Sequence, residues 1–183
     1  AEPDRPAAGG PGPSRAGAGA TLVRAAAAGG NSGRGAPEDM RVKLAVEFPS
    51  VAYREGPEAV LRLARAIEEI GFDHIDIFDH VVMGFPVDGR PPGPYNPAMP
   101  IVEALMGLSY IAAATARVTL GTEVLVLPQR EPTLVAKQVS TLDTLSGGRV
   151  RLGIGVGWQE SEYEAMGVDF HTRGARMDEA IAL

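Results

Sequence analysis

Hydrophobic positions from residue 42 onward follow two different periods in turn. Residues 42, 44, 46 and 48 are Val, Leu, Val and Phe, and they alternate with positions that include Lys43 and Glu47. This period of two predicts a strand over 42–48. Gly56 and Pro57 then precede a stretch in which aliphatic residues recur every three or four positions, and Gly71 follows it. Proline in the first turn and glycine after the last predict a helix between them.

The same alternation of strand and helix patterns repeats to the end of the chain. A Gly- and Pro-rich stretch at 84–100 reads as a long loop. Because strands that alternate with helices build parallel sheets, we expect four βα units. The further predicted elements are strands at 74–78, 118–127 and 150–156 and helices at 102–116, 131–147 and 174–183. On the helix at 131–147 the expected apolar face holds Leu134, Val135, Gln138, Val139, Leu142 and Leu145.

Two parallel-sheet architectures compete for this pattern. A doubly wound dinucleotide-binding sheet would place a glycine-rich turn after its first strand, but residues 49–52 contain no glycine. The one glycine cluster, Gly153-x-Gly155-x-Gly157, continues into Trp158 and does not complete the G-x-G-x-x-G spacing. A (β/α)8 barrel instead collects functional side chains at the carboxyl ends of its strands. Polar or aromatic residues stand at all four predicted ends, namely Glu47, Asp79-His80, Gln129-Arg130 and Trp158-Gln159-Glu160. The sequence therefore favours a TIM (β/α)8 barrel fold of which about the first four βα units are present.

Residues 1–39 have a different composition from the rest. They contain 11 Ala, 9 Gly and 5 Pro, and Leu22 and Val23 are their only large aliphatic residues. Such a segment cannot bury enough apolar surface to offset the entropy of ordering, so we expect 1–39 to be a disordered extension and 40–183 to be the folded half-barrel. Arg24 interrupts the only weakly apolar stretch, which argues against a secretory signal, and four acidic residues argue against a transit peptide. We expect Met40 to be the natural start of the folded part.

Charge and cysteine content exclude several classes of function. The chain has 17 Lys+Arg against 23 Asp+Glu, a net charge of −6, and no cysteine. The absence of cysteine excludes a disulfide scaffold, a thiolate zinc site and a catalytic thiol. The net negative charge does not favour binding to nucleic acid. No apolar run approaches the roughly 20 residues of a membrane helix. We expect a cytoplasmic protein with no nucleic-acid or membrane partner.

Candidate chemistry gathers at the predicted strand ends. Asp79-His80 is suited to acid–base work, because a histidine beside a carboxylate exchanges protons near neutral pH; the alternative is a surface pair that caps the following loop. Glu123 stands within an apolar strand and requires a partner, a bulge or a place near the mouth. Glycines before Trp158 would let a flat ligand approach the backbone and stack on the indole; the alternative is tight packing of strand on helix with a half-buried aromatic residue. Glu47, Asp76, Asp79 and His80 contain metal-ligand types, but their spacing matches no metal motif, so we expect no metal.

Longer stretches carry a family resemblance. The segments IGFDHIDIFDH, VTLGTEVLVLPQREPTLVAKQVSTLDTLSGGRVRLGIGVGWQESEYEAMG and RGARMDEAI resemble the luciferase-like monooxygenase superfamily, and within it the oxidoreductases that use the deazaflavin coenzyme F-420. The resemblance runs from about residue 42 to residue 183. It implies a (β/α)8 barrel of about 250 residues or more, with a flavin-type ring at the mouth and FMN as the competing cofactor.

The resemblance also implies roles for individual residues. His80 would lie against the ring and assist hydride or proton movement, with Asp79 touching the ring or orienting His80. A non-prolyl cis peptide at Glu123-Val124 would back the ring, and many relatives have a glutamate where this chain has Trp158. Glu47 is the carboxylate that remains as a possible catalytic group. The expected cofactor-binding set is Asp79, His80, Glu123, Val124, Gly155, Val156, Gly157 and Trp158, and the expected catalytic pair is His80 and Glu47.

Two classes of function follow. The first is a flavin- or deazaflavin-dependent oxidoreductase acting on a small organic substrate, homo-oligomeric in its full-length form. The second is a truncated or degenerate half-barrel that binds a flavin or a partner without turnover, because only four strands and an uncapped final helix are present.

Overall fold

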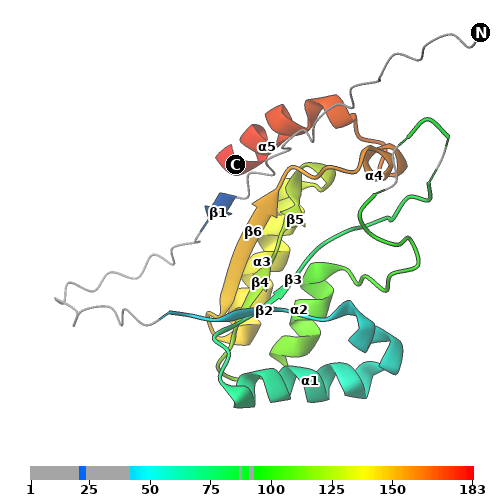
Figure 1. Cartoon of the computed structure of the whole chain (residues 1–183). Helices are drawn as coiled ribbons and strands as arrows, with labels where there is room; N and C mark the ends of the chain where they lie inside the picture. The colour runs from blue at the N-terminus through cyan, green and yellow to red at the C-terminus, as the bar shows by residue number, and fades with distance from the viewer. Residues whose placement is uncertain (1–20, 24–41, 87, 91–92) are drawn as a thin grey trace, which may run out of the picture.

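The computed structural model describes residues 21–23, 42–86, 88–90 and 93–183 (Figure 1). Short 3-10 turns η1 (Ser50–Glu55), η2 (Leu127–Gln129) and η3 (Phe170–Thr172) join the longer elements. The strands are β1 (Thr21–Val23), β2 (Ala45–Glu47), β3 (His74–Ile77), β4 (Thr119–Thr122), β5 (Leu125–Val126) and β6 (Val150–Gly155). The helices are α1 (Pro57–Ile70), α2 (Ala104–Ala112), α3 (Pro132–Ser146), α4 (Glu160–Ala165) and α5 (Arg173–Ala182).

Strands β2, β3, β4 and β6 lie side by side in chain order and are all parallel (Figure 1). Helix α2 packs against β3 and β4 and contacts α1 on one side and α3 on the other. This is the sequential strand order that repeated βα units produce. The predicted α/β class and its four βα units are therefore confirmed.

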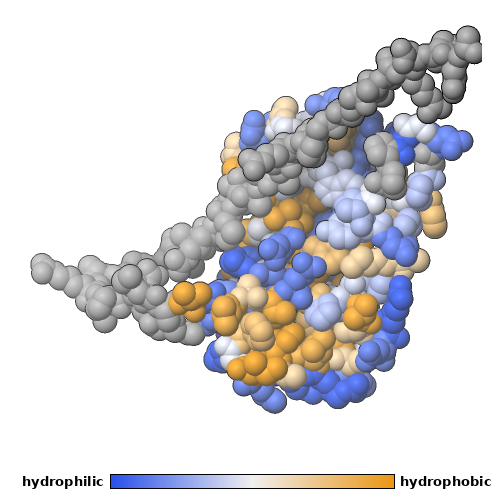
Figure 2. Space-filling model, viewed as in Figure 1, coloured by the Kyte–Doolittle hydropathy of each residue, from blue (hydrophilic) through white to orange (hydrophobic). Residues whose placement is uncertain are grey.

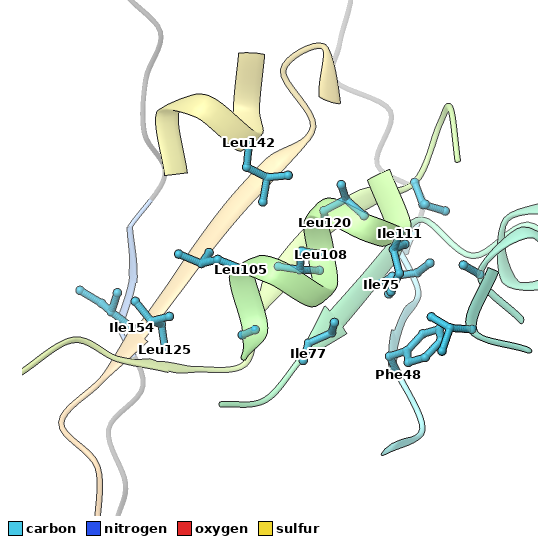
Figure 3. Close-up of a cluster of buried hydrophobic side chains, with 14 of the residues drawn as sticks. Phe48, Ile75, Ile77, Leu105, Leu108, Ile111, Leu120, Leu125, Leu142 and Ile154 are labelled. Atoms are coloured by element: carbon cyan, nitrogen blue, oxygen red, sulfur yellow. The ribbon is translucent and has the colours of Figure 1, made fainter. Parts of the chain in front are cut away.

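The hydrophobic core lies between the sheet and this helical layer. Ile75 and Ile77 of β3, two residues apart, face the helices together with Leu120 of β4. Figure 3 shows Leu105 and Leu108 of α2 entering the same cluster. Because strand side chains alternate between faces, the residues between these positions point to the opposite, inner face of the sheet.

Helix ends follow the predicted capping chemistry. Gly71 ends α1 and Gly147 ends α3 in the left-handed conformation, with φ of 108° and 75°. The Glu131 side chain accepts the backbone N–H groups of Thr133 and Leu134 at the start of α3. These contacts explain why α1 and α3 begin and end close to the predicted positions.

Two apolar faces are narrower than predicted. Val42 and Leu44 are 81% and 57% exposed, because β2 begins only at Ala45, where its pairing with β3 starts. On α3, Leu134 and Leu145 are exposed, so the prediction that they face the core is wrong. The helix buries only a stripe that includes Val135 and Leu142. Orange side chains accordingly gather on the surface in Figure 2, mainly where Figure 1 draws α1 and α2.

A short strand lies within the segment that was expected to be a disordered extension, at Thr21–Val23. These residues form β1, which pairs antiparallel with β6 so that Thr21 lies opposite Ile154. Strand pairing of this kind uses backbone hydrogen bonds, which composition does not reveal. The remainder of the expected extension, with Met40, lies outside the described residues.

The third predicted strand is divided rather than continuous. The peptide bond between Glu123 and Val124 is cis, as the family resemblance implied, and it separates β4 from β5. A Cβ atom added to Gly153 would lie 2.2 Å from the Thr122 carbonyl oxygen. Both short strands pair with β6, so the absence of a side chain at Gly153 lets the interrupted strand approach it closely.

In the described part of the chain, no helix is both long and apolar enough to cross a membrane.

Candidate functional site

Three consecutive residues that follow β3 have buried side chains. Phe78, Asp79 and His80 are 9%, 3% and 8% exposed. Asp79 contacts the last residue of β5 and Arg130 beyond it, whereas His80 contacts α4 and an aromatic cluster. The carboxyl end of β3 thus places a carboxylate and an imidazole in different surroundings.

Asp79 is held by Arg130 in a buried ion pair. Nη1 of Arg130 lies 2.7 Å from Oδ2 of Asp79, and Nη2 lies 3.0 Å from Oδ1. The backbone N–H of Val126 donates to Oδ2 at 3.3 Å, and Glu103 lies 3.4 Å from the same guanidinium. Since both carboxylate oxygens are occupied, Asp79 links the ends of β3 and β5 and does not pair with His80.

His80 pairs with a residue that is 82 positions away in the sequence. Its Nδ1 lies 3.1 Å from Oε2 of Glu162, on α4, and Glu162 is only 1% exposed. Oε1 of Glu162 accepts the backbone N–H groups of Val81 and Val82 at 2.5 and 3.1 Å. The glutamate therefore fixes both the imidazole and the chain that follows it.

The pKa of the Glu162 carboxyl is lowered despite its burial. Burial raises the pKa of the Glu162 carboxyl, but the hydrogen bonds from His80 and from the Val82 N–H lower it more, and the net shift is downward. A buried carboxylate of this kind is stable only because each oxygen has a donor.

An aromatic cluster surrounds the imidazole. The ring centroids of Tyr95 and Trp158 lie 5.6 and 5.5 Å from that of His80, each in an edge-on orientation. Phe78 stacks on Tyr95 at 5.5 Å. Trp158 is 43% exposed, and a Cβ atom on Gly93 would lie 2.9 Å from its indole. Glycine at 93 thus lets the loop approach the indole closely.

The loop after β3 is attached to α4 at further points. Nε2 of Gln159 donates to the Val82 carbonyl at 2.8 Å, and Arg90 pairs with Glu164 through two hydrogen bonds of 3.1 and 2.7 Å. Between the loop and α4 lies a pocket of about 300 Å³, at the small end of the range for ligand pockets. Its lining includes Phe85, Arg90, Trp158, Glu160, Ser161 and Phe170.

The inner face of the sheet carries a second polar group. Asp76, 1% exposed, pairs with Arg151 at 2.5 Å. Burial raises the pKa of the Glu123 carboxyl, and the nearby Asp76 and Glu47 carboxylates raise it further, while Arg151 opposes them. In the described residues no three carboxylate or histidine side chains are grouped in a way that could hold a metal ion.

Glu47 lies among these inner-face carboxylates. It is exposed, stands opposite Asp76 in the strand register, and makes no hydrogen bond with His80 within the described residues. The structure therefore does not bring the two predicted catalytic residues together. His74 begins β3, at the end opposite His80.

The glycine-rich end of β6 packs closely against the strand segment around β5, whereas the alternative to ligand binding was packing of strand on helix. A Cβ atom on Gly155 would lie 2.4 Å from Val124, and one on Gly157 would lie 2.7 Å from Val126. The carbonyl oxygen of Val156 accepts the Tyr163 hydroxyl at 2.5 Å. These glycines thus allow close contact between strands, and their use by a ligand stays a prediction.

Sequence reasoning missed Glu162 and the helix that carries it. Helix α4 is six residues long and lacks a side-chain cap, so it shows neither a clear period nor a start signal. Glu162 also stands among Glu160 and Glu164, in a stretch that is typical of a solvent-exposed surface. The only local signal is Tyr163, which is fully buried.

Comparison with known proteins places this geometry in a family. An uncharacterised Mycobacterium tuberculosis protein is 37% identical over 66% of this chain and 44% of its own length. An F-420-dependent glucose-6-phosphate dehydrogenase from Kineococcus radiotolerans is 36% identical over 76% of this chain and 40% of its own length. The crystal structure of a Streptomyces bottropensis monooxygenase superposes with a TM-score of 0.62 at 26% identity, covering 77% of this chain and 41% of that one.

The chain thus spans less than half the length of these relatives. The model of the luciferase-like monooxygenase family matches residues 23–183, which include all four βα units and every candidate site residue. The fold is accordingly that of part of a luciferase-like TIM barrel, and the chain belongs to the luciferase-like monooxygenase family.

Proposed function

We propose that the whole protein is an oxidoreductase that uses coenzyme F-420 and acts on a small organic substrate at the barrel mouth, with FMN as the alternative cofactor. The observation that carries the proposal is the position of His80, which follows β3 and lies edge-on to Trp158 and Tyr95. The named dehydrogenase relative supports F-420 as the cofactor.

The residues present fit a flat heteroaromatic ring. The half-exposed Trp158 indole offers a stacking surface, and within the described residues Nε2 of His80 has no hydrogen-bond partner. When bound, the cofactor supplies hydride chemistry, which protein side chains cannot provide. His80 would hold or release a proton at Nε2, and Tyr95 and Trp158 would limit the access of water.

The other predicted contacts are part of the same proposal. Asp79 acts indirectly, by fixing the end of β5 through Arg130. Glu123, Val124 and the backbone at 155–157 would lie beside the ring, and Glu47 would supply a carboxylate from the inner face. The homo-oligomeric state of the full-length form stays a prediction.

Equilibrium titration of the whole protein with F-420 and with FMN tests the cofactor assignment. We expect F-420 to bind more tightly, with a change in fluorescence on binding. Preferential binding of FMN would move the assignment to the alternative, and binding of neither would overturn the proposal.

Replacement of His80 by Ala tests its catalytic role. We expect turnover to fall by about 10²- to 10⁴-fold, the range that proton transfer contributes, while the cofactor still binds. His171→Ala is the matched control, because His171 is exposed on η3 and should leave turnover unchanged. Unchanged turnover in His80→Ala would remove His80 from the mechanism.

A further inference from the structure

We infer that Glu162 is a positioning residue that keeps a proton on Nδ1 of His80, so that Nε2 is the nitrogen left for a ligand. Its catalytic consequence rests on the proposed function, but the assignment of the proton does not. The inference concerns a residue of α4, whereas the family resemblance drew attention only to the neighbour of His80 in the sequence, Asp79.

The donors around Glu162 determine the direction of its hydrogen bonds. Oε1 accepts two backbone N–H groups, from Val81 and Val82, and Oε2 faces Nδ1 of His80. An ionised carboxylate has no proton to donate, so the hydrogen bond with Nδ1 forms only if Nδ1 carries the hydrogen. The neutral imidazole has one hydrogen, and Nε2 is then an acceptor.

The surroundings prevent either partner from rotating away. Two consecutive backbone N–H groups, of Val81 and Val82, bind the Glu162 carboxylate, and these groups cannot move unless the ordered backbone around them moves. The imidazole is 8% exposed and has Tyr95 and Trp158 at its edges. Among the described residues, Glu162 is the only charged side chain that hydrogen-bonds to His80.

The variant Glu162→Gln reverses the hydrogen bond without changing its shape. The amide oxygen of Gln is needed by Val81 and Val82, because two buried N–H groups would otherwise lose their acceptor. The amide NH₂ then faces Nδ1, which must become an acceptor, and the proton moves to Nε2. Glu164→Gln is the matched control, since it changes the same residue type on the same helix and touches Arg90 rather than His80.

Nitrogen-15 NMR of labelled histidine in the whole protein measures the tautomer directly. His80→Ala identifies the His80 signal among those of the other histidines. We expect the Nδ1-protonated form in the natural protein and in Glu164→Gln, and the Nε2-protonated form in Glu162→Gln. An Nε2-protonated His80 in the natural protein would overturn the inference, and this measurement needs no variant that might fail to fold. A proton that stays on Nδ1 in a folded Glu162→Gln would also overturn it.

Turnover and cofactor affinity, measured beside the tautomer, distinguish the role of Glu162 from the proposed function. If both hold, Glu162→Gln loses about 10²-fold or more in turnover while its affinity for the cofactor is unchanged, because the wrong nitrogen is presented. If the protein binds neither F-420 nor FMN but the tautomer changes as expected, the proposed function fails and the role of Glu162 stands.

Discussion

The Asp79–Arg130 ion pair allows a quantitative test of how the mouth is held together. The two side chains are 0% and 12% exposed, and two short hydrogen bonds join them. Arg130→Met leaves the Asp79 carboxylate buried, and the Val126 N–H is then its only hydrogen-bond partner among the residues that the structure describes. Removing one partner of such a pair costs about 3–5 kcal/mol. For a chain of this size, 3 kcal/mol corresponds to a fall in Tm of about 6–12 °C.

A surface pair in the same protein provides the control. The side chains of Arg90 and Glu164 form an equally short contact of 2.7 Å but are 35% and 57% exposed. Arg90→Met should therefore destabilise the protein far less than Arg130→Met, because both partners of this pair are exposed to solvent. Urea denaturation of the three proteins compares the free energies of unfolding directly.

A double variant identifies the cause of the loss. Asp79→Asn removes the unpaired charge but keeps an oxygen for the Val126 N–H, so the combination with Arg130→Met should be more stable than Arg130→Met alone. The reasoning is refuted if Arg130→Met costs no more than Arg90→Met, or if adding Asp79→Asn lowers stability further.

Two further predictions concern the inner face and a loop. Gly121→Ala places a Cβ atom 1.9 Å from a buried carboxylate oxygen of β3 and should lower the free energy of unfolding by about 1–3 kcal/mol. Gly174→Ala is the control, because it lies on the open side of α5 and should be neutral or stabilising. Equal effects of the two variants in urea denaturation would contradict the steric argument. Burial raises the pKa of the Glu68 carboxyl, but three backbone N–H groups from residues 116–118 lower it more. The ionised Glu68 carboxylate therefore contributes fully to stability above the ordinary pKa of 4.5, and this contribution is lost as the pH falls through the lowered pKa. Glu68→Gln should thus destabilise the protein at pH 7, and the difference should shrink as the pH falls below 4.5. A difference that is independent of pH would exclude this explanation.

The elements of the fold could be predicted from local pattern where packing and pattern agree. Helix α1 was predictable because Gly56, Pro57 and Gly71 mark its ends and its apolar positions are regular. The exposure of Leu134 and Leu145 on α3 was not, since it depends on how much of the helix its neighbours cover. An apolar residue in the sequence indicates what can be buried and not what is buried.

The sequence predicted two residues of the candidate site but not the residues that hold them. Asp79-His80 at a strand end drew attention because acid–base groups at such positions are typical of barrels. The partners were not predictable, because Arg130 and Glu162 lie 51 and 82 positions from the residues they hold. Glu162 in particular has the composition of a solvated surface, and only the tertiary fold shows that it is buried.

The distance in sequence between His80 and Glu162 has a consequence for the folding of the protein. Their contact closes a segment that contains α2, β4, β5, α3 and β6, so the mouth cannot be completed before those elements have assembled. Contacts between residues so far apart in the sequence form late in folding, because the chain between them must lose conformational entropy before the contact is made. During synthesis, β3 emerges with His80 unrestrained, and its imidazole becomes fixed only after α4 has left the ribosome and docked.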